Sequence, residues 1–169
     1  MYEQFNFPKN LSREEKINEI LLSASTTCKD ILYGELLELQ ISDYVYCPDE
    51  AIEELGLDKE LVHQLTEDYV IQILKSISQF HQYLEKLKKE DEENRNLDYV
   101  ALRELAHKNL GVARNLRIKD AEKLLYILMK KDDLQYISVS IKALKACAIK
   151  LNPICAYDTL NLIKIKSNF

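Results

Sequence analysis

Glycine and proline are scarce in this chain, since its 169 residues contain only three of each, and tryptophan is absent. Average proteins contain roughly 12% of glycine and proline together. A β-sandwich or β-barrel needs a turn about every ten residues, and such turns are usually built from these two residue types. Their scarcity therefore argues strongly against an all-β fold. It also excludes the collagen-like and low-complexity classes.

Long apolar segments are also missing. No apolar run approaches the roughly 18 residues of a membrane span, and residues 1–10 lack the basic stretch and apolar block of a secretory signal. We therefore expect a cytoplasmic protein that does not bind membranes. The four cysteines, Cys28, Cys47, Cys147 and Cys155, show no Cys-x-x-Cys spacing. Reduced thiols and no zinc site are accordingly expected.

Charge is distributed unevenly along the chain. The net charge is −5, but residues 46–98 alone sum to −8, whereas residues 99–131 carry eight basic and three acidic residues. The overall negative sign argues against nucleic acid as the main partner. The basic segment 99–131 is suited to an acidic protein surface or to a phosphate group.

The N-terminal third predicts one helix followed by less regular structure. Ser12 and Glu15 form a capping-box pattern, so a helix should begin near residues 11–13. The apolar stretch 31–41 is interrupted by Gly34 and fits either a second helix or a bent continuation of the first. Residues 42–48 read as a loop, and residues 49–55 as a short helix ended by Gly56. We expect residues 1–45 to pack against the remainder, although self-pairing and partner binding are alternatives.

Residues 58–152 predict four amphipathic helices with short connections. The first is a long helix over 58–89, capped by Asp58 and followed by a polar linker over 88–96. The second starts near Asp98 and breaks at 115–118, and the third covers 119–130. Asp132 or Asp133 caps the fourth, which ends at residues 152–153. The pattern predicts an all-α protein, an antiparallel up-down four-helix bundle with an extra helical N-terminal segment.

This organisation divides the chain into three parts. Residues 1–48 form a helical extension that packs on the bundle, residues 49–152 form the bundle, and residues 153–169 form a tail with room for one short helix.

Among the three histidines, His107 is the candidate for chemistry. It lies mid-helix, and the apolar positions of that helix fall on its other side, so we expect its imidazole to face solvent. The positions three, four and seven residues away are mostly charged: Arg103, Glu104, Leu110, Gly111 and Arg114. Glycine in a helix interior costs about 1 kcal/mol relative to alanine, so Gly111 suggests a need for space beside the ring. Arg103, Lys108 and Arg114 are placed to stabilise an anion carried by the ring.

A metal site is the competing interpretation of these residues. Glu60 and His63, like Glu104 and His107, match the Glu-x-x-His spacing of di-iron bundles. Such ligands must project inward, whereas this row is basic and would repel a dication. We therefore expect no metal, and we expect His63 and His81 to be surface or half-buried histidines.

The segment Ala106-His-Lys-Asn-Leu-Gly-Val-Ala-Arg-Asn-Leu116 resembles the motif of histidine-containing phosphotransfer (HPt) domains. His107, Gly111, Asn115 and Leu116 stand at the family's relative positions. The resemblance extends over residues 50–152 or so and leaves the N-terminal extension and the tail outside. Two positions depart from the family pattern, which has leucine and then lysine where this chain has Asn109 and Leu110. We expect Asn109 to fall in the buried row and Leu110 on the exposed histidine face.

The resemblance implies a phosphorelay intermediate of two-component signal transduction. His107 would accept a phosphoryl group from a receiver-domain aspartate or a histidine kinase and pass it on, as a stoichiometric carrier rather than an enzyme. Gly111 would give clearance, and Lys108 and Arg114 would stabilise charge. Arg103, Glu104 and Leu110 would contact the partner. The chain itself would need no cofactor, since magnesium would sit on the receiver, and a monomer is favoured. The alternative is a degenerate binding module that regulates a receiver or kinase without phosphotransfer, and the Leu110 substitution favours it.

Overall fold

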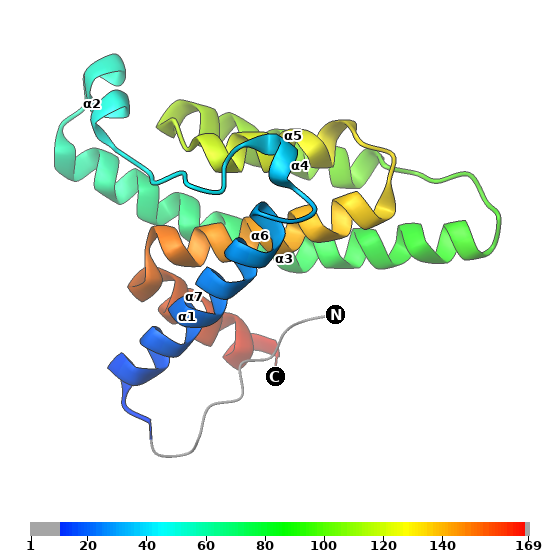
Figure 1. Cartoon of the computed structure of the whole chain (residues 1–169), viewed down its shortest axis with the longest axis horizontal. Coiled ribbons are helices and arrows are strands. Elements are labelled where there is room, and N and C mark those ends of the chain that lie inside the picture. The colour runs from blue at the N-terminus through cyan, green and yellow to red at the C-terminus, as the bar shows by residue number, and fades with distance from the viewer. Residues whose placement is uncertain (1–10, 168–169) are drawn as a thin grey trace.

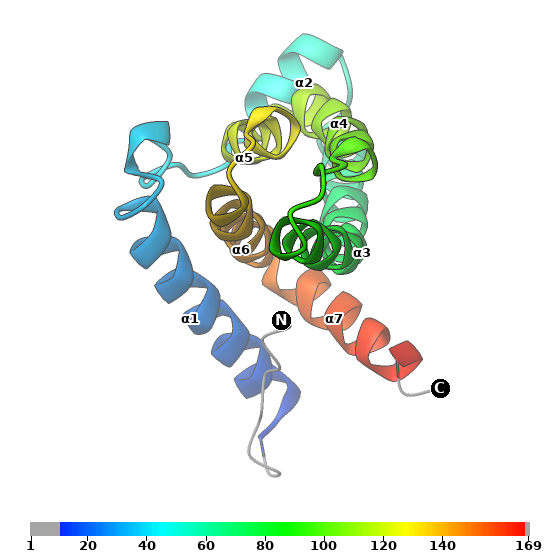
Figure 2. The ribbon, with the colours of Figure 1, turned by 90° about the vertical axis from the view of Figure 1, so that its right-hand side faces the viewer.

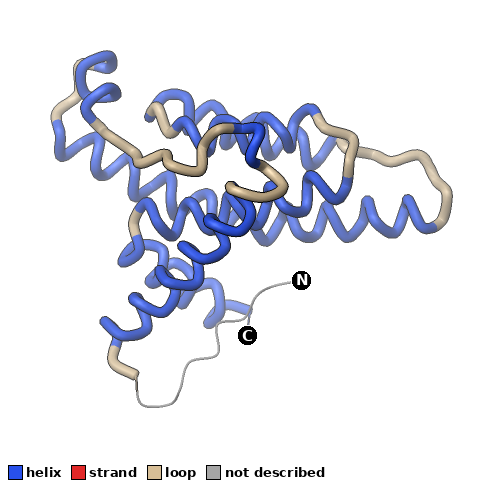
Figure 3. Tube along the Cα trace, viewed as in Figure 1, coloured by secondary structure: helices blue, strands red, loops and turns tan. Residues whose placement is uncertain are grey.

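The computed structural model describes residues 11–167. Within this range the chain forms seven α-helices, one short 3₁₀ helix and no β-strand (Figure 3). In chain order the elements are α1 (Arg13–Leu32), η1 (Leu37–Leu39), α2 (Asp49–Leu55), α3 (Lys59–Glu92), α4 (Val100–Leu116), α5 (Lys119–Lys130), α6 (Leu134–Leu151) and α7 (Pro153–Ser167). The prediction of an all-α protein is confirmed. None of the described helices has the length and apolar character needed to cross a membrane.

Helices α3, α4, α5 and α6 pack as a bundle around one apolar core (Figure 1). Each contacts the next in the chain, and α6 returns to contact α3, so that Figure 2 shows the four arranged around a common axis. All four helices contribute fully buried side chains, including Phe80, Leu102, Leu125 and Ile141. Removal of this apolar surface from water, worth about 25 cal/mol per Å², is the main force holding the bundle together.

Three helices begin at a side-chain cap that the sequence predicts. Ser12 Oγ accepts the backbone N–H of Glu15 at 3.2 Å, and Asp58 Oδ1 accepts that of Leu61 at 2.7 Å. Asp133, rather than Asp132, caps α6 through the N–H of Tyr136 at 3.1 Å. Each cap satisfies a backbone donor that the helix itself leaves unpaired, and contributes about 1 kcal/mol.

The end of α3 lies later than the sequence pattern indicates. The prediction of a polar linker over 88–96 is wrong in its first half, because α3 continues to Glu92. Lysine and glutamate are strong helix formers, so this charged run continues the helix, with Lys89, Asp91 and Glu92 on its exposed side. Leu87 and Glu90 on the same turns are buried. The connection to α4 therefore covers only residues 93–99.

Beyond Leu32, the apolar stretch 31–41 is neither a second α-helix nor a bent continuation of α1, because it contains only turns and the short η1; residues 42–48 form the predicted loop. The chain turns away after Leu32, where a Cβ on Gly34 would lie 2.5 Å from the carbonyl oxygen of Asp30. Only glycine fits that approach. Leu36 and Ile41 then anchor the segment by inserting into the core. Beyond it, α2 and its left-handed end at Gly56, with φ of 64°, occur as predicted.

Besides the short α2, helices α1 and α7 lie outside the ring of four. α1 packs against α6 and α7, and α7 packs against α3 and α6 (Figure 2). An ion pair joins the two helices, since Arg13 Nη2 lies 2.8 Å from both carboxylate oxygens of Asp158. Within the tail, residues 153–167 form the helix α7. The division of the chain into extension, bundle and tail stays a prediction.

Candidate functional site

His107 lies on the solvent side of α4, as the sequence predicts. The opposite side of this helix is buried against the bundle and consists of Leu102, Ala106, Asn109, Leu110, Ala113 and Leu116. Because α4 is held between α3 and α5, the orientation of this face is set by packing rather than by the histidine itself. The imidazole is thus presented to solvent from a rigid element.

Gly111 lies one turn after His107 and is also exposed. A Cβ built at this position would meet nothing within 4 Å. The packing of this chain therefore does not require glycine here, although glycine weakens a helix interior by about 1 kcal/mol relative to alanine. Any need for its small size must come from a group that approaches the helix from outside.

Asn109 is fully buried between α4 and α3, as expected from its place in the apolar row. Its Nδ2 donates to Ser76 Oγ at 3.1 Å and to the carbonyl of Leu105 at 2.9 Å. Its Oδ1 accepts from Gln72 Nε2 at 3.2 Å. A buried amide is costly unless it is paired, and this network pairs it while fixing the rotation of α4 against α3.

The expectation that Leu110 lies on the exposed histidine face is wrong. Leu110 is only 1% exposed. It stands four residues after Ala106 and three before Ala113, and both alanines are buried. The apolar side of α4 is therefore wider than the spacing suggested, and it includes the row to which Leu110 belongs. Leu110 is a core residue and leaves the set of candidate partner contacts.

Arg103 is occupied within the chain rather than turned toward His107. Its guanidinium hydrogen-bonds the carbonyls of Met129 and Lys131 at the end of α5 and pairs with Asp132. It also lies over the ring of Tyr99, 4.4 Å from the centroid. A cation at a helix C-terminus satisfies carbonyls that lack partners. Arg103 therefore joins α4 to the end of α5, which removes it from the cations expected beside the ring.

Lys108 and Arg114 are the exposed cations that remain on or beside the histidine face. The carboxylate of Glu104 is also exposed there. Lys108 borders a shallow groove between α3 and α4 that also includes Lys75 and Gln79. Burial raises the pKa of Glu122 on α5, and the positive charge of the nearby Arg114 partly opposes this rise.

Residues 42–48 form a loop, as predicted, and this loop is a strap over the turn between α4 and α5. The sequence did not indicate that contact. Tyr46 donates its hydroxyl to the carbonyl of Leu116 at 2.7 Å. Tyr44 donates to the carbonyl of Arg117 and accepts the N–H of Lys119, both at 3.1 Å. The two tyrosines thus satisfy backbone groups at a helix junction. Nothing in a loop sequence indicates which distant carbonyls its hydroxyls will reach.

Acidic residues outside the basic segment neutralise part of its charge. Arg117 Nε lies 2.6 Å from Glu54 Oε2, and Lys119 Nζ lies 3.2 Å from Glu50 Oε2. Both carboxylates come from α2, which is joined to α3 by a short loop. The positive charge of residues 99–131 is therefore less available to a partner than the sequence count indicates.

The other two histidines lie away from this face. His63 is exposed on α3 and lies 3.1 Å from Glu67 Oε1. His81 is half-buried, and burial lowers its pKa to about 4, with the nearby Lys145 acting in the same direction. Glu60 and Glu104 are exposed with their histidine partners. They do not project inward as di-iron ligands would, and residues 11–167 contain no cluster of three candidate metal ligands.

No family model, no curated protein and no solved structure matches this chain. The function must therefore be argued from the site itself.

Proposed function

We propose that this protein is a phosphorelay intermediate whose bundle, α3 to α6, is an antiparallel up-down four-helix bundle of the HPt type. His107 accepts a phosphoryl group from the aspartate of a receiver domain, or from a histidine kinase, and passes it on. The proposal rests above all on one observation: an exposed imidazole in the middle of a rigid helix, with an exposed glycine one turn later that the chain's own packing does not require.

The chemistry needs little from the protein beyond position and charge. A neutral imidazole nitrogen of His107 attacks the phosphorus of the aspartyl phosphate. The new P–N bond forms as the P–O bond to the aspartate breaks, and the carboxylate leaves. Gly111 leaves room for the approaching active site, and the exposed cations Lys108 and Arg114 are placed to stabilise the phosphoryl oxygens. Magnesium belongs to the receiver in this scheme.

Docking in this scheme relies on shape and on a small number of charges. Arg103, Arg117 and Lys119 are paired within the chain, so the partner meets Lys108, Arg114 and the carboxylate of Glu104. Leu110 contributes from inside by packing α4 rather than by touching the partner. Rim charges of this kind change association rates more than final affinity. We accordingly expect binding that weakens as ionic strength rises.

A second function, regulation by docking without phosphotransfer, is favoured by one specific observation. The position where the HPt pattern carries a phosphate-stabilising lysine is Leu110, which is buried. Lys108, one of the two remaining cations, borders the groove between α3 and α4. A bundle that docks a receiver or kinase and blocks it would need neither a lysine at that position nor His107.

The experiment that separates the two functions is transfer from a panel of phosphorylated receiver domains to the wild type and to His107→Gln. His63→Gln is the matched control, because it removes an exposed histidine from another bundle helix. A phosphocarrier acquires acid-labile, base-stable label in the wild type and in His63→Gln but not in His107→Gln. Receiver binding without label in any variant identifies the docking module. If the protein acquires no label and binds no receiver, both functions are contradicted.

A further inference from the structure

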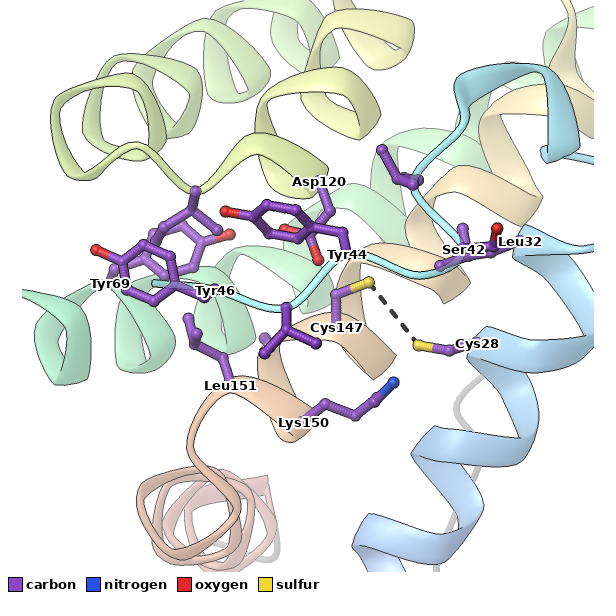
Figure 4. Close-up of a pocket in the computed structure, with 14 residues that line it drawn as sticks. Cys28, Leu32, Ser42, Tyr44, Tyr46, Tyr69, Asp120, Cys147, Lys150 and Leu151 are labelled. Carbon is purple, nitrogen blue, oxygen red and sulfur yellow. Dashed lines mark hydrogen bonds between the residues drawn. The ribbon is translucent and has the colours of Figure 1, made fainter. Parts of the chain in front are cut away.

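Two thiols face each other at the contact between α1 and α6. The Sγ atoms of Cys28 on α1 and Cys147 on α6 lie 3.8 Å apart (Figure 4), although 119 residues separate them in the chain. All four cysteines are free in the structure. A disulfide needs sulfurs about 2 Å apart, so a shift of roughly 2 Å would bring this pair to bonding distance.

The surroundings make the two thiols unequal. The hydrogen bond with Cys147 lowers the pKa of Cys28, and the Lys150 ammonium lowers it further against the effect of burial. The same hydrogen bond raises the pKa of Cys147 well above its ordinary value, and burial and the carboxylate of Asp120 add to the effect. Lys150 therefore favours a negative charge on Cys28, whereas Asp120 disfavours one on Cys147.

Cys28 is buried, at 4% exposure, and Cys147 is half-buried, but a cavity reaches the pair. The thiols border a cavity of about 170 Å³ that lies beneath the strap and is also lined by Tyr44, Asp120 and Lys150 (Figure 4). Cys28 borders a second depression as well, beside Gly34 at the end of α1. Thiolate character together with access is what distinguishes reactive cysteines from structural ones.

We propose that Cys28 and Cys147 form an oxidation site that a hydroperoxide converts to an intramolecular disulfide. The Cys28 thiolate attacks the outer peroxide oxygen, the O–O bond breaks, and the departing oxygen takes up a proton, leaving Cys28 as a sulfenic acid. The Cys147 sulfur then attacks the Cys28 sulfur. The S–S bond forms as the S–O bond of the sulfenic acid breaks, and the hydroxyl group leaves as water with the proton of the Cys147 thiol. In total, two thiols are oxidised and one hydroperoxide is reduced.

The bond would join α1 covalently to the bundle. Because it closes a loop of more than a hundred residues, it restricts the unfolded chain strongly. We therefore expect the oxidised protein to melt at a higher temperature than the reduced protein, and the difference to vanish with a dithiol reductant. The inference is independent of phosphotransfer, since it uses neither His107 nor any residue of its face.

The test uses a full-length background in which Cys47→Ser and Cys155→Ser leave only the pair. Hydrogen peroxide should remove both free thiols, and mass spectrometry of the digest should find the Cys28–Cys147 cross-link in the monomer. Adding Cys147→Ser should leave Cys28 as a sulfenic acid that dimedone traps, whereas adding Cys28→Ser should give no dimedone adduct. Thermal melting of each reduced variant verifies that it is folded.

The wild type provides an internal rate reference, because Cys47 is exposed. The proposal requires Cys28 to lose its free thiol to peroxide faster than Cys47 does in the same folded molecule. A slower loss at Cys28, a cross-link only between chains, or a dimedone adduct on Cys147 rather than Cys28 would overturn it.

Discussion

Asn109 lies on the buried side of α4, opposite the proposed phosphoacceptor, and three side-chain and backbone partners satisfy its amide. The helix side that faces α3 is thus specified by polar pairing, while the side that faces solvent carries His107 and Gly111. The burial of Asn109 and the exposure of His107 follow from the spacing of apolar residues alone. The burial of Leu110 and the pairing of Arg103 within the chain do not follow from that spacing. Helix spacing does not show how wide the apolar side of a helix becomes, or which carbonyls a long side chain reaches.

Asn109→Ala should lower the free energy of unfolding by about 1–3 kcal/mol, because Ser76 and Gln72 lose their partner in a buried site. Urea unfolding measures the change. Asn115→Ala is the matched control, since Asn115 is exposed on the same helix and its replacement should change stability by less than about 0.5 kcal/mol. Equal effects at the two positions would show that the buried network contributes nothing.

Gly111→Ala distinguishes a glycine that a docking partner requires from one that the packing of this chain requires. The added methyl group meets nothing within 4 Å, so the variant should be more stable than the wild type by about 0.5–1 kcal/mol. If the glycine provides clearance for a partner, the same variant should accept a phosphoryl group more slowly. Urea unfolding and the transfer rate give the two values, and a destabilised variant would mean that the glycine serves packing.

At the scale of elements, the sequence predicts most helices closely, because their ends carry chemical signals. Ser12, Asp58 and Asp133 cap the helices that follow them, and Gly56 ends α2 as expected. The end of α3 was misplaced because lysine and glutamate serve equally well in a loop and on an exposed helix face. The loop over residues 42–48 was predicted, but its role as a strap was not, since that role depends on contacts with residues some 70 positions away.

Tyr46→Phe tests the strap as a structural element. The variant keeps the ring but loses the hydrogen bond to the Leu116 carbonyl at the end of α4, and should lose about 0.5–1.5 kcal/mol of stability. Tyr126→Phe is the control, because Tyr126 is half exposed on α5 and its change should be smaller. Hydrogen exchange should also be faster around residues 116–119 in Tyr46→Phe. Unchanged exchange there would contradict the role assigned to the strap.

For the whole molecule, the bundle, α1 and α7 form one continuous apolar core, so a group that titrates at its edge affects the stability of the fold. His81 is such a group, because burial lowers its pKa from 6.5 to about 4. The unfolded chain takes up a proton on this side chain near pH 6.5, whereas the folded chain does so only near pH 4. Stability should therefore fall as the pH is lowered through this interval.

His81→Gln should weaken this acid dependence. About 1–2 kcal/mol of the loss between pH 6.5 and pH 4 should disappear, a figure that allows for the partial exposure of the ring. Urea unfolding at a series of pH values gives the slope. An unchanged slope in His81→Gln would contradict the account.

The central claim is that His107 carries the phosphoryl group, and mapping that group tests it most directly. The wild type is phosphorylated by a receiver, digested at neutral pH and analysed by electron-transfer fragmentation, which preserves the P–N bond. The account predicts phosphohistidine at residue 107 and at no other histidine. Phosphate on His63 or His81, or a protein that stays unmodified while it binds the receiver, would contradict it.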